Sequence, residues 1–463
     1  MDKKKNIGLA IAVVILIGTL IIPAPEGLNV AGKNALGLLL AGIVLWITEA
    51  VPLGISAMLL MILLPLYGVT EKLAIVFKDF MSPVIFFVIA TFAITTVIMK
   101  TPLATRITGK ILDWAGDDSK KLVLGFCIAA ALLSTVTSNV PTCALFMALG
   151  LTVLECTGGK PGKSNLGKCL MIGIPFATMI GGGGTPAGTS INIMAIGLLE
   201  QAANVQISFL DWMIMAMPMV IIMVPIAWFT IVTVFKPEPI KQSDLVSLKK
   251  TIDDLGPMSS QEKKVITIIA VMLVLWVAST WFPVLDTTMV AIAGLVVMFL
   301  PGVNVITWDD FVAGVSWNII LLIGGVSALA SGILSTGAAS WLVTATMSGA
   351  AGWGATITTL GASALMTLMH VLVPVGPAIV GMATPPIAGL AVISGASAAA
   401  LTVMVAFMAA ITFILPIDCV PLLTYGKGYY TMPDFVKAGI VPTIALILYC
   451  TFLLPHLAVL VGL

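Results

Sequence analysis

Residues 168–199 form an apolar stretch that is interrupted at its centre by the sequence GGGGTPAG, residues 181–188. Four glycines and a proline forbid a continuous helix there, and each apolar flank is too short to cross a bilayer alone. Non-helical backbone inside a membrane is tolerated only where it lines a protein cavity, because every unpaired backbone group in hydrocarbon is costly. The stretch therefore predicts a broken helix at a binding site, with the half-helix that begins near Thr189 directing its amide end into the gap.

The composition places this stretch in a membrane protein. Hydrophobic residues make up 59% of the 463 positions, charged residues make up 9%, and the mean hydropathy is +1.14. A soluble domain needs more charge than this on its surface, so we expect a polytopic membrane protein. The net charge of +1, without basic patches, argues against nucleic-acid binding. The six cysteines form no CxxC pair and there are two histidines, so no transition-metal site or enzyme active site is expected.

Apolar segments predict an all-α protein with about eleven transmembrane helices, each of which needs ~20 apolar residues unless it is tilted or short. The predicted spans and interrupted elements lie near residues 7–23, 34–49, 53–66, 83–99, 121–156, 168–199, 211–235, 265–281, 286–300, 317–334, 353–390, 397–415 and 438–461. Most basic residues then fall on one side. The positive-inside rule predicts a protein of the cell (plasma) membrane with a cytoplasmic N-terminus and an extracellular C-terminus.

The two halves of the chain look related. Three corresponding pairs are separated by 231, 236 and 230 residues: Asp79 and Asp310, Asn139 and Val375, and Pro186 and Pro416. We expect an N-terminal span (1–33), a first repeat (34–235), a cytoplasmic linker (236–264), a connecting span (265–285) and a second repeat (286–463). Each repeat contains a re-entrant hairpin (121–156 and 353–390) and a broken helix (168–199 and 397–430). Such inverted repeats with discontinuous helices are typical of secondary transporters.

The first repeat offers polar groups at its hairpin tip, TSNVPT, residues 137–142. Pro141 lacks an amide hydrogen, so a helix should stop there and leave Ser138 and Asn139 at the tip. A polar helix cap is the alternative for the tip, and close packing at small residues is the alternative for residues 181–192. We favour a binding site at both, because polar groups deep in a bundle usually serve a transport pathway.

The second repeat offers fewer side-chain groups. His370 precedes the proline-rich tip and is either a packed, hydrogen-bonded histidine or a cation beside an anion. Asp418, Thr424 and Lys427 follow the break in the last broken helix, and Lys427 is better explained as a lysine that snorkels to the interface. The single arginine, Arg106, is predicted in a cytoplasmic loop, so helix N-termini and small polar side chains would have to bind an anion.

Together, TSNVPT, GGGGTPAGTSINIMA and the segments LWITEAVPLGISAMLLMILLPLYGV and ITWDDFVAGVSWNIILLIGGVSALASGILSTGAASWL resemble the divalent anion–sodium symporter (DASS) family of di- and tricarboxylate transporters. The resemblance covers essentially the whole chain. It implies a homodimer of eleven-span protomers that work by an elevator mechanism, with the hairpins and broken helices holding the substrate.

In symporters of this family each hairpin tip reads Ser-Asn-Thr, and the tips bind carboxylate and help to hold sodium. Ser138 and Asn139 match the first tip, with Val140 in place of the threonine, whereas Pro374-Val375-Gly376 stands at the second tip. This departure resembles the sodium-independent exchangers of the family, such as citrate/succinate and oxoglutarate/malate antiporters. A fixed cation, His370 or Lys427, would replace the ion's charge.

We therefore expect an antiporter that exchanges C4 and C5 dicarboxylates of the succinate, malate and oxoglutarate type, with citrate as a further candidate. A sodium-coupled dicarboxylate symporter is the alternative, and a small-anion channel is a more distant one. The expected substrate-binding residues are Ser138, Asn139, Thr142, Thr189, Gly376, Pro377, Ala378, Asp418 and Thr424. If Na+ is used, the expected ligands are Ser138, Asn139, Gly184 and Thr185. Beyond substrate and possible Na+, the lipid bilayer and a second copy of the chain are the expected partners, with no cofactor or nucleic acid.

Overall fold

The computed structural model describes residues 3–282, 284–347, 354–373 and 375–463, and every regular element in these residues is a helix. The predicted second hairpin includes residue 353 and Pro374, which lie outside the described residues.

The first half of the chain contains α1 (Lys3–Ile21), α2 (Val30–Thr48), α3 (Leu53–Leu66), α4 (Leu73–Phe80), α5 (Pro83–Met99), α6 (Leu103–Ala115), α7 (Ser119–Ser134), α8 (Asn139–Cys156), α9 (Asn165–Gly183), α10 (Ser190–Ala203) and α11 (Phe209–Phe235). The linker holds a short 3-10 helix (Gln242–Leu245) and α12 (Val246–Asp253).

The second half contains α13 (Ser260–Ala278), α14 (Thr287–Phe299), α15 (Trp308–Gly314), α16 (Trp317–Ser335), α17 (Ala338–Met347), α18 (Gly354–Leu372), α19 (Gly376–Ser394), α20 (Ala398–Ala410), α21 (Cys419–Tyr425), α22 (Met432–Leu448) and α23 (Leu454–Leu460). A π-helical turn (Tyr449–Leu453) joins the last two helices.

Within the described residues, nine helices are long and apolar enough to cross a membrane, and the bent pair α5 and α6 raises this number to ten. The predicted total of about eleven counted α13 as a span and left out the hairpin helices α8, α18 and α19. It also counted the short helices α3, α14 and α20. These helices have 14, 13 and 13 residues, fewer than the ~20 that a straight crossing needs. The fold class is confirmed: this is an all-helical, multi-pass membrane protein with broken helices.

Local capping explains where several helices begin. Ser208 and Asp211 form a reciprocal capping box at the start of α11, and Ser259 and Glu262 form another at the start of α13. Because of the second box, α13 begins inside the segment that we predicted as linker. Arg106 lies on the helix α6, so its predicted place in a loop is wrong.

The order of elements repeats along the chain. The series α3 to α11 and the series α14 to α22 each contain a short apolar helix, a surface helix, a span, a connecting helix, a helix pair, a broken helix and a further helix. Packing between the halves is reciprocal: α3 packs on α16 and α5 on α14, whereas α10 packs on α19 and α21 on α8. Reciprocal contacts of this kind are expected when two related halves face each other across a pseudo-two-fold axis.

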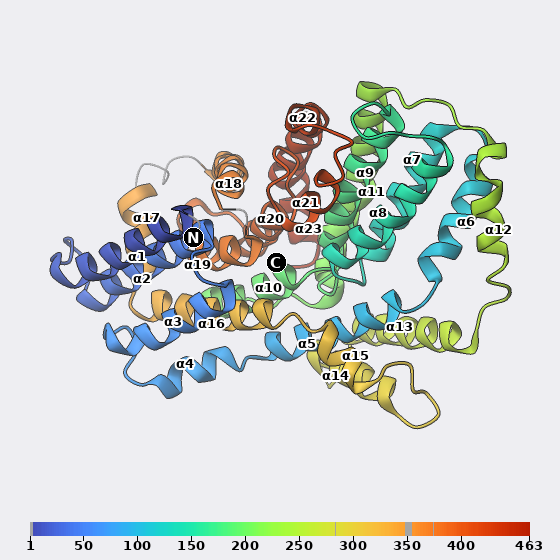
Figure 1. Ribbon diagram of the computed structural model, residues 1–463. Helices are drawn as coiled ribbons and strands as arrows, with labels where there is room; N and C mark the ends of the chain where they lie inside the picture. The colour runs from blue at the N-terminus through green and yellow to red at the C-terminus, as the bar shows by residue number, and fades with distance from the viewer. Residues whose placement is uncertain (1–2, 283, 348–353, 374) are drawn as a thin grey trace.

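Figure 1 shows how these helices are arranged. α1 and α2 pack together at one end of the molecule, and α6 and α12 pack together at the opposite end. The helices that flank the chain breaks, α8 to α10 and α19 to α21, lie between these two ends. The interruptions predicted from glycine and proline are therefore held in the interior of the bundle.

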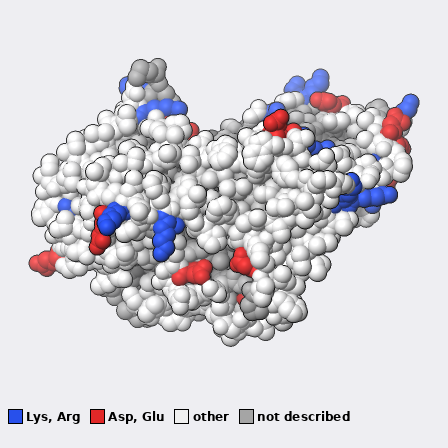
Figure 2. Space-filling view, turned by 90° about the horizontal axis from the view of Figure 1, so that it is seen from below, with Lys and Arg blue, Asp and Glu red and all other residues white. Residues whose placement is uncertain are grey.

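The surface fits a protein that lies in lipid. Figure 2 shows a face composed largely of uncharged residues, with the charged side chains gathered in separate groups. Large apolar side chains are exposed on the helices, among them Val14, Ile221 and Phe229, which are 69%, 67% and 63% exposed. In water such a surface would be unfavourable, whereas hydrocarbon chains cover it at no such cost.

Candidate functional site

The first broken helix is interrupted where the sequence predicts it. α9 ends at Gly183, α10 begins at Ser190, and Thr189 caps α10 by accepting a hydrogen bond from the Ile191 amide. Glycine is required on the α9 side, because a Cβ atom on Gly181 would lie 2.1 Å from the Ala131 carbonyl oxygen. The break therefore presents the carbonyl end of α9, which attracts cations, close to the amide end of α10, which attracts anions.

The first hairpin tip lies against this break. α7 ends at Ser134 and α8 begins at Asn139, so the hairpin is interrupted near the predicted place, at residues 135–138. The expectation that Pro141 stops a helix is wrong, because Pro141 lies in the first turn of α8, where its missing amide hydrogen costs nothing. The side-chain amide of Asn139 occupies the space left by Gly182, where a Cβ atom would be 1.8 Å from Asn139 Oδ1. Ser134 Oγ donates a hydrogen bond to the same oxygen at 2.9 Å. Tip and break thus form one site.

Buried oxygen atoms gather at this site. Asn192 donates hydrogen bonds from Nδ2 to the carbonyl oxygens of Gly182 and Thr185, at 2.8 and 2.7 Å. Its other side-chain atom, Oδ1, is buried without a hydrogen-bond partner among the described residues. An oxygen with no donor, set among carbonyls at the end of α9, is suited to a small hard cation such as Na+.

Two predicted residues at this site have different environments. Ser138 is half-buried, and its hydroxyl makes no hydrogen bond within the described part of the chain, so it is available to a ligand. Thr142 is buried, and its hydroxyl lies 2.5 Å from Thr137 Oγ1 and donates to the Ser138 carbonyl at 3.0 Å. Thr142 therefore closes the tip and is already satisfied.

Thr185 also joins the tip to the break. Its hydroxyl donates to the Thr135 carbonyl at 2.5 Å and accepts from the Ala187 amide at 3.1 Å. Of the predicted sodium ligands, Thr185 thus contributes its carbonyl oxygen more readily than its hydroxyl, and Gly184 lies next to it at the end of α9.

Sequence reasoning missed Ser134. No helical spacing identifies it, because α7 ends at Ser134 and its partner Asn139 begins the next helix. The prediction stopped at residue 137 because the helix break was expected there.

The second hairpin tip contributes backbone groups. Val375 precedes α19 and provides no side-chain cap, and Pro377 occupies the first turn. Gly376 packs so closely that a Cβ atom would lie 2.4 Å from Ile191 Cδ1 and 2.6 Å from the Ala409 carbonyl. The second tip, including the buried Ala378, therefore lies against α10 of the first broken helix.

The second broken helix contacts the first hairpin in return. α20 ends at Ala410, residues 411–418 are non-helical, and Asp418 caps α21 by accepting from the Val420 amide at 3.1 Å. The Cys143 thiol of α8 donates to the Val420 carbonyl at 3.6 Å. The structure thus brings the start of α21 next to the first hairpin, one residue beyond Thr142.

His370 and Asp418 form a pair that the sequence did not predict. His370 is 2% exposed, and its Nε2 atom lies 3.7 Å from Asp418 Oδ2. Its Nδ1 atom is 2.7 Å from the Met408 carbonyl oxygen. The structure shows the hydrogen bond of the first explanation, and it also places the ring beside a carboxylate; the role of His370 as a cation stays a prediction.

The remaining predicted residues lie apart from this pair. The Thr424 hydroxyl donates to the Pro421 carbonyl at 3.1 Å and lies 3.1 Å from the Tyr430 hydroxyl. Lys427 is exposed on the turn after α21. Neither side chain joins the buried cluster around His370 and Asp418.

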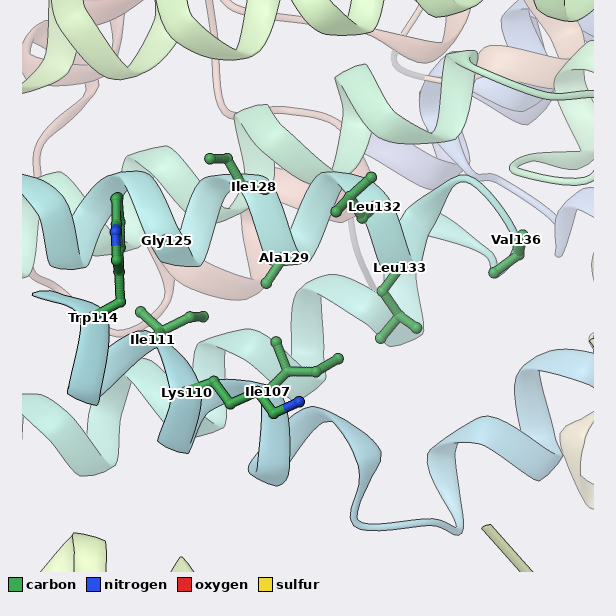
Figure 3. A pocket seen from close by; sticks show the side chains of 10 residues that line it. All are labelled: Ile107, Lys110, Ile111, Trp114, Gly125, Ile128, Ala129, Leu132, Leu133 and Val136. Carbon is green, nitrogen blue, oxygen red and sulfur yellow. The ribbon is translucent and has the colours of Figure 1, made fainter. Parts of the chain in front are cut away.

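A separate cavity, away from the chain breaks, is lined mostly by apolar side chains. It has a volume of about 530 Å³ and lies between α6 and α7. Figure 3 shows its lining, in which the side chains of Ile107, Ile111, Ile128 and Leu132 surround the space and Lys110 lies at its edge. Such an apolar lining offers a dianion almost no hydrogen bonds, so this cavity is not the substrate site.

Comparisons with known proteins agree with this architecture. Residues 3–461 match the family model described as the sodium:sulfate symporter transmembrane region. A membrane protein of Cupriavidus necator is 27% identical over 94% of this chain and 89% of its own length. The sodium-dependent dicarboxylate transporter SdcS of Staphylococcus aureus is 26% identical over 97% of this chain and 91% of its own length.

A solved structure shares the fold. The crystal structure of the Alcanivorax borkumensis YdaH transporter aligns with a TM-score of 0.55 at 12% identity, covering 84% of this chain and 87% of that chain. With a family model that spans nearly its whole length, this protein is a transporter and not an enzyme. The chain belongs to the sodium:sulfate symporter family, the divalent anion–sodium symporter family that its hairpin and glycine motifs resemble.

Proposed function

We propose that this chain is a sodium-coupled transporter of C4 and C5 dicarboxylates. The observation that carries the proposal is the oxygen cluster of the first half. There Asn192 Oδ1 is buried beside the carbonyls of Gly182 and Thr185, with no donor among the residues that the structure describes. Ser134, Ser138 and Asn139 add side-chain oxygens from the hairpin tip. A relative over nearly the whole chain is named a sodium-dependent dicarboxylate transporter, which supports the same assignment.

Substrate carboxylates would be held without a guanidinium group. Arg106, the single arginine, donates to both carboxylate oxygens of Glu262 at 2.6 and 3.3 Å and to the Gly256 carbonyl at 2.6 Å, so it is engaged at the linker. In our proposal one carboxylate binds the Ser138 hydroxyl and the amides at the start of α10. The other binds the amides at the start of α19, near Gly376.

The assembly and the transport motion belong to the same proposal. From the family resemblance we propose a homodimer that works by an elevator mechanism, in which the hairpins and broken helices move together. We also retain the plasma membrane as its location, with the N-terminus in the cytoplasm and the C-terminus outside.

Obligatory exchange of dicarboxylates is the second candidate function. It is favoured by the second tip, where Val375 stands in place of a serine–asparagine pair and makes no side-chain cap. A carrier with fewer ion ligands has more difficulty in returning empty, and this favours exchange. Sodium coupling, the alternative from the sequence, replaces exchange as our main proposal because the first half keeps its oxygen ligands and a relative over nearly the whole chain is named sodium-dependent.

Uptake into proteoliposomes tests the proposal. Vesicles without internal dicarboxylate should accumulate labelled succinate when an inward sodium gradient is imposed. Asn139→Ala removes a buried side-chain oxygen and should lower the apparent sodium affinity by roughly 10- to 100-fold, a loss of ~1–3 kcal/mol. Thr152→Ala is the matched control, because Thr152 only donates to the Ala148 carbonyl within α8.

Uptake that requires internal dicarboxylate and ignores sodium would establish exchange instead. Flux that does not saturate with succinate would indicate a channel. Unchanged sodium affinity in Asn139→Ala would show that the first tip has only a structural role.

A further inference from the structure

His370 is a buried titratable group that the sodium site and the substrate site leave unused. The Met408 carbonyl can only accept a hydrogen bond, so the contact at 2.7 Å fixes a proton on His370 Nδ1. The other ring nitrogen, Nε2, is buried without a hydrogen-bond partner in the described residues and lies 3.7 Å from Asp418 Oδ2. The Met408 carbonyl therefore sets the tautomer, and the Asp418 carboxylate is the group that faces the other ring nitrogen.

The two protonation states of this pair differ in the free energy needed to bury them. With a proton on Nε2, the imidazolium and the carboxylate form a neutral pair. Without it, a nitrogen lone pair faces a carboxylate, and the buried site carries a net negative charge. The first state is favoured in a membrane interior, and imidazole can lose the proton near neutral pH.

The helix end adds to this preference. Met408 lies in the last turn of α20, which ends at Ala410, so the Nδ1 contact is made to the carbonyl end of a helix. That end carries a partial negative charge, which stabilises a nearby cation. The same kind of helix end, that of α9, lies beside the oxygen cluster in the first half.

The two halves therefore place different groups at corresponding positions. The offset of 236 residues that relates Asn139 to Val375 also relates Ser134 to His370, because 134 + 236 = 370. Asp418 caps α21 as Thr189 caps α10. Neutral oxygens in the first half are thus matched by an ionisable pair in the second.

We propose that His370 and Asp418 form a proton-binding site that takes up and releases one proton in each transport cycle. On release the N–H bond at Nε2 breaks and the proton passes to water, leaving a neutral imidazole and a carboxylate. The inference rests on the proposed transport of a dianion, because the negative charge left behind would repel such a substrate. Substrate would therefore load while the proton is bound.

A small cavity gives this proton a first step towards solvent. It lies beside His370 and is lined in part by Thr367, Thr412 and Thr443. Its volume of about 10 Å³ is roughly the space that one water molecule requires.

Other titratable groups near the pair are neutral or already paired. The Cys419 thiol lies 3.3 Å from Asp418 Oδ1, and thiols and phenols ordinarily titrate above pH ~8. Three thiol or phenol groups come from neighbouring elements: Cys143 of α8, Tyr430 after α21, and Tyr449 of the π-helical turn, which donates to the Met215 carbonyl. Lys168 of α9 and Asp434 of α22 form an ion pair, and His456 of α23 is exposed. His456 is the second histidine of the chain, so the measurement on His370 is made in a variant that lacks it.

The chain offers a direct measurement of this site, because it has two histidines. In His456→Gln labelled with ¹⁵N-histidine, His370 is the single reporter, and its nitrogen resonances should move from the imidazolium to the neutral form between pH 5 and 9. A resonance that stays in one form over this range overturns the proposal.

Transport provides the second measurement. Proteoliposomes that contain a pH-sensitive dye, with the voltage clamped by potassium and valinomycin, should acidify inside as succinate enters. His370→Gln and Asp418→Asn should abolish acidification, while His456→Gln should retain it.

The outcomes separate the two proposals. If no dicarboxylate enters under any gradient, the proposed function fails, and the nuclear resonance titration still decides the proton site. If uptake follows sodium without acidification in the wild-type protein, the proton site is overturned and the proposed function stands. A misfolded His370 or Asp418 variant changes neither conclusion. Uptake and acidification are read from the wild-type protein, and the resonance titration is read with His370 and Asp418 unchanged.

Discussion

The breaks in the two halves of this protein have the same architecture and different chemistry. In the first half, Asn139, Asn192 and nearby carbonyls surround the end of α9 with neutral oxygens. In the second half, His370 contacts the end of α20 and lies beside Asp418, the cap of α21, and the described residues of the hairpin tip offer backbone amides without a polar side chain. In our two proposals one scaffold carries two kinds of cation site, one for a metal ion and the other for a proton.

The difference teaches that the geometry of a helix break and the choice of the cation that it binds are set by different parts of the chain. A chain break places a carbonyl end and an amide end close together whatever side chains stand there, and this attracts a cation and an anion. The side chains then decide which cation is held. In this account the first half selects Na+ through its oxygens, and the second half replaces it with a protonated imidazole.

The largest expected effect comes from filling the space between tip and break in the first half. A methyl group on Gly182 would lie 1.8 Å from Asn139 Oδ1, so Gly182→Ala should force the tip away from α9. Overpacking of this kind costs ~1–3 kcal/mol, and sodium-dependent uptake should fall roughly 10- to 100-fold.

The matched control for this change lies in the second half. A Cβ atom on Gly426 would make an ordinary contact, 3.6 Å from the Leu422 carbonyl, so Gly426→Ala should keep its sodium dependence. Equal losses in both variants would contradict the assignment of sodium binding to the first half.

A smaller effect is expected when the first tip is loosened without removing a ligand. Thr142→Val deletes the hydroxyl that lies 2.5 Å from Thr137 Oγ1, so Thr137 loses this hydrogen bond. The loss of one buried hydrogen bond costs ~0.5–1.5 kcal/mol, so the apparent sodium affinity should fall about two- to tenfold.

Sodium titrations of uptake at fixed succinate measure this change. Thr424→Val removes a buried hydroxyl of the second half that bonds to Pro421 and should leave the sodium affinity unchanged. If Thr424→Val alone lowered the sodium affinity, sodium would bind in the second half and not in the first.

The smallest effect on transport is expected at a contact outside both breaks. The hydrogen bond from Arg106 holds the pKa of Glu262 at about 2, below its ordinary value. Because this pKa is lowered on folding, the pair stabilises the protein above pH ~4.3, and its contribution is lost as the pH falls towards 2.

Arg106→Lys should therefore lower the melting temperature at pH 7, with a difference from wild type that shrinks below pH ~4.3. Succinate uptake per folded protein should stay unchanged, as a melting curve paired with an uptake assay would test. A difference that grows on acidification would show that Glu262 is not stabilised as an anion by this contact.

The sequence predicted the helix breaks well because glycine and proline act locally. Predicted segments 53–66 and 83–99 coincide with α3 and α5, and the three predicted interruptions are found within a few residues of their predicted places, at 135–138, 184–189 and 411–418. Within hydrocarbon a backbone stays helical unless its own residues prevent it, because unpaired backbone groups are costly there. The local sequence therefore decides where a helix breaks.

Pairings between distant residues could not be predicted in the same way. His370 and Asp418 are 48 residues apart, since 418 − 370 = 48, and they meet because α18 packs beside α20. The role of Ser134 was missed because its partner Asn139 lies beyond the helix end. The amphipathic helix α6 was also missed, since a search for spans passes over helices of mixed polarity.

The most direct test of a single sodium site in the first half is the sodium activation curve of succinate uptake, measured at constant pH and voltage. One sodium site predicts a hyperbolic curve with a Hill coefficient of about 1. A sigmoidal curve with a coefficient near ~2, or uptake that ignores sodium altogether, would contradict the account.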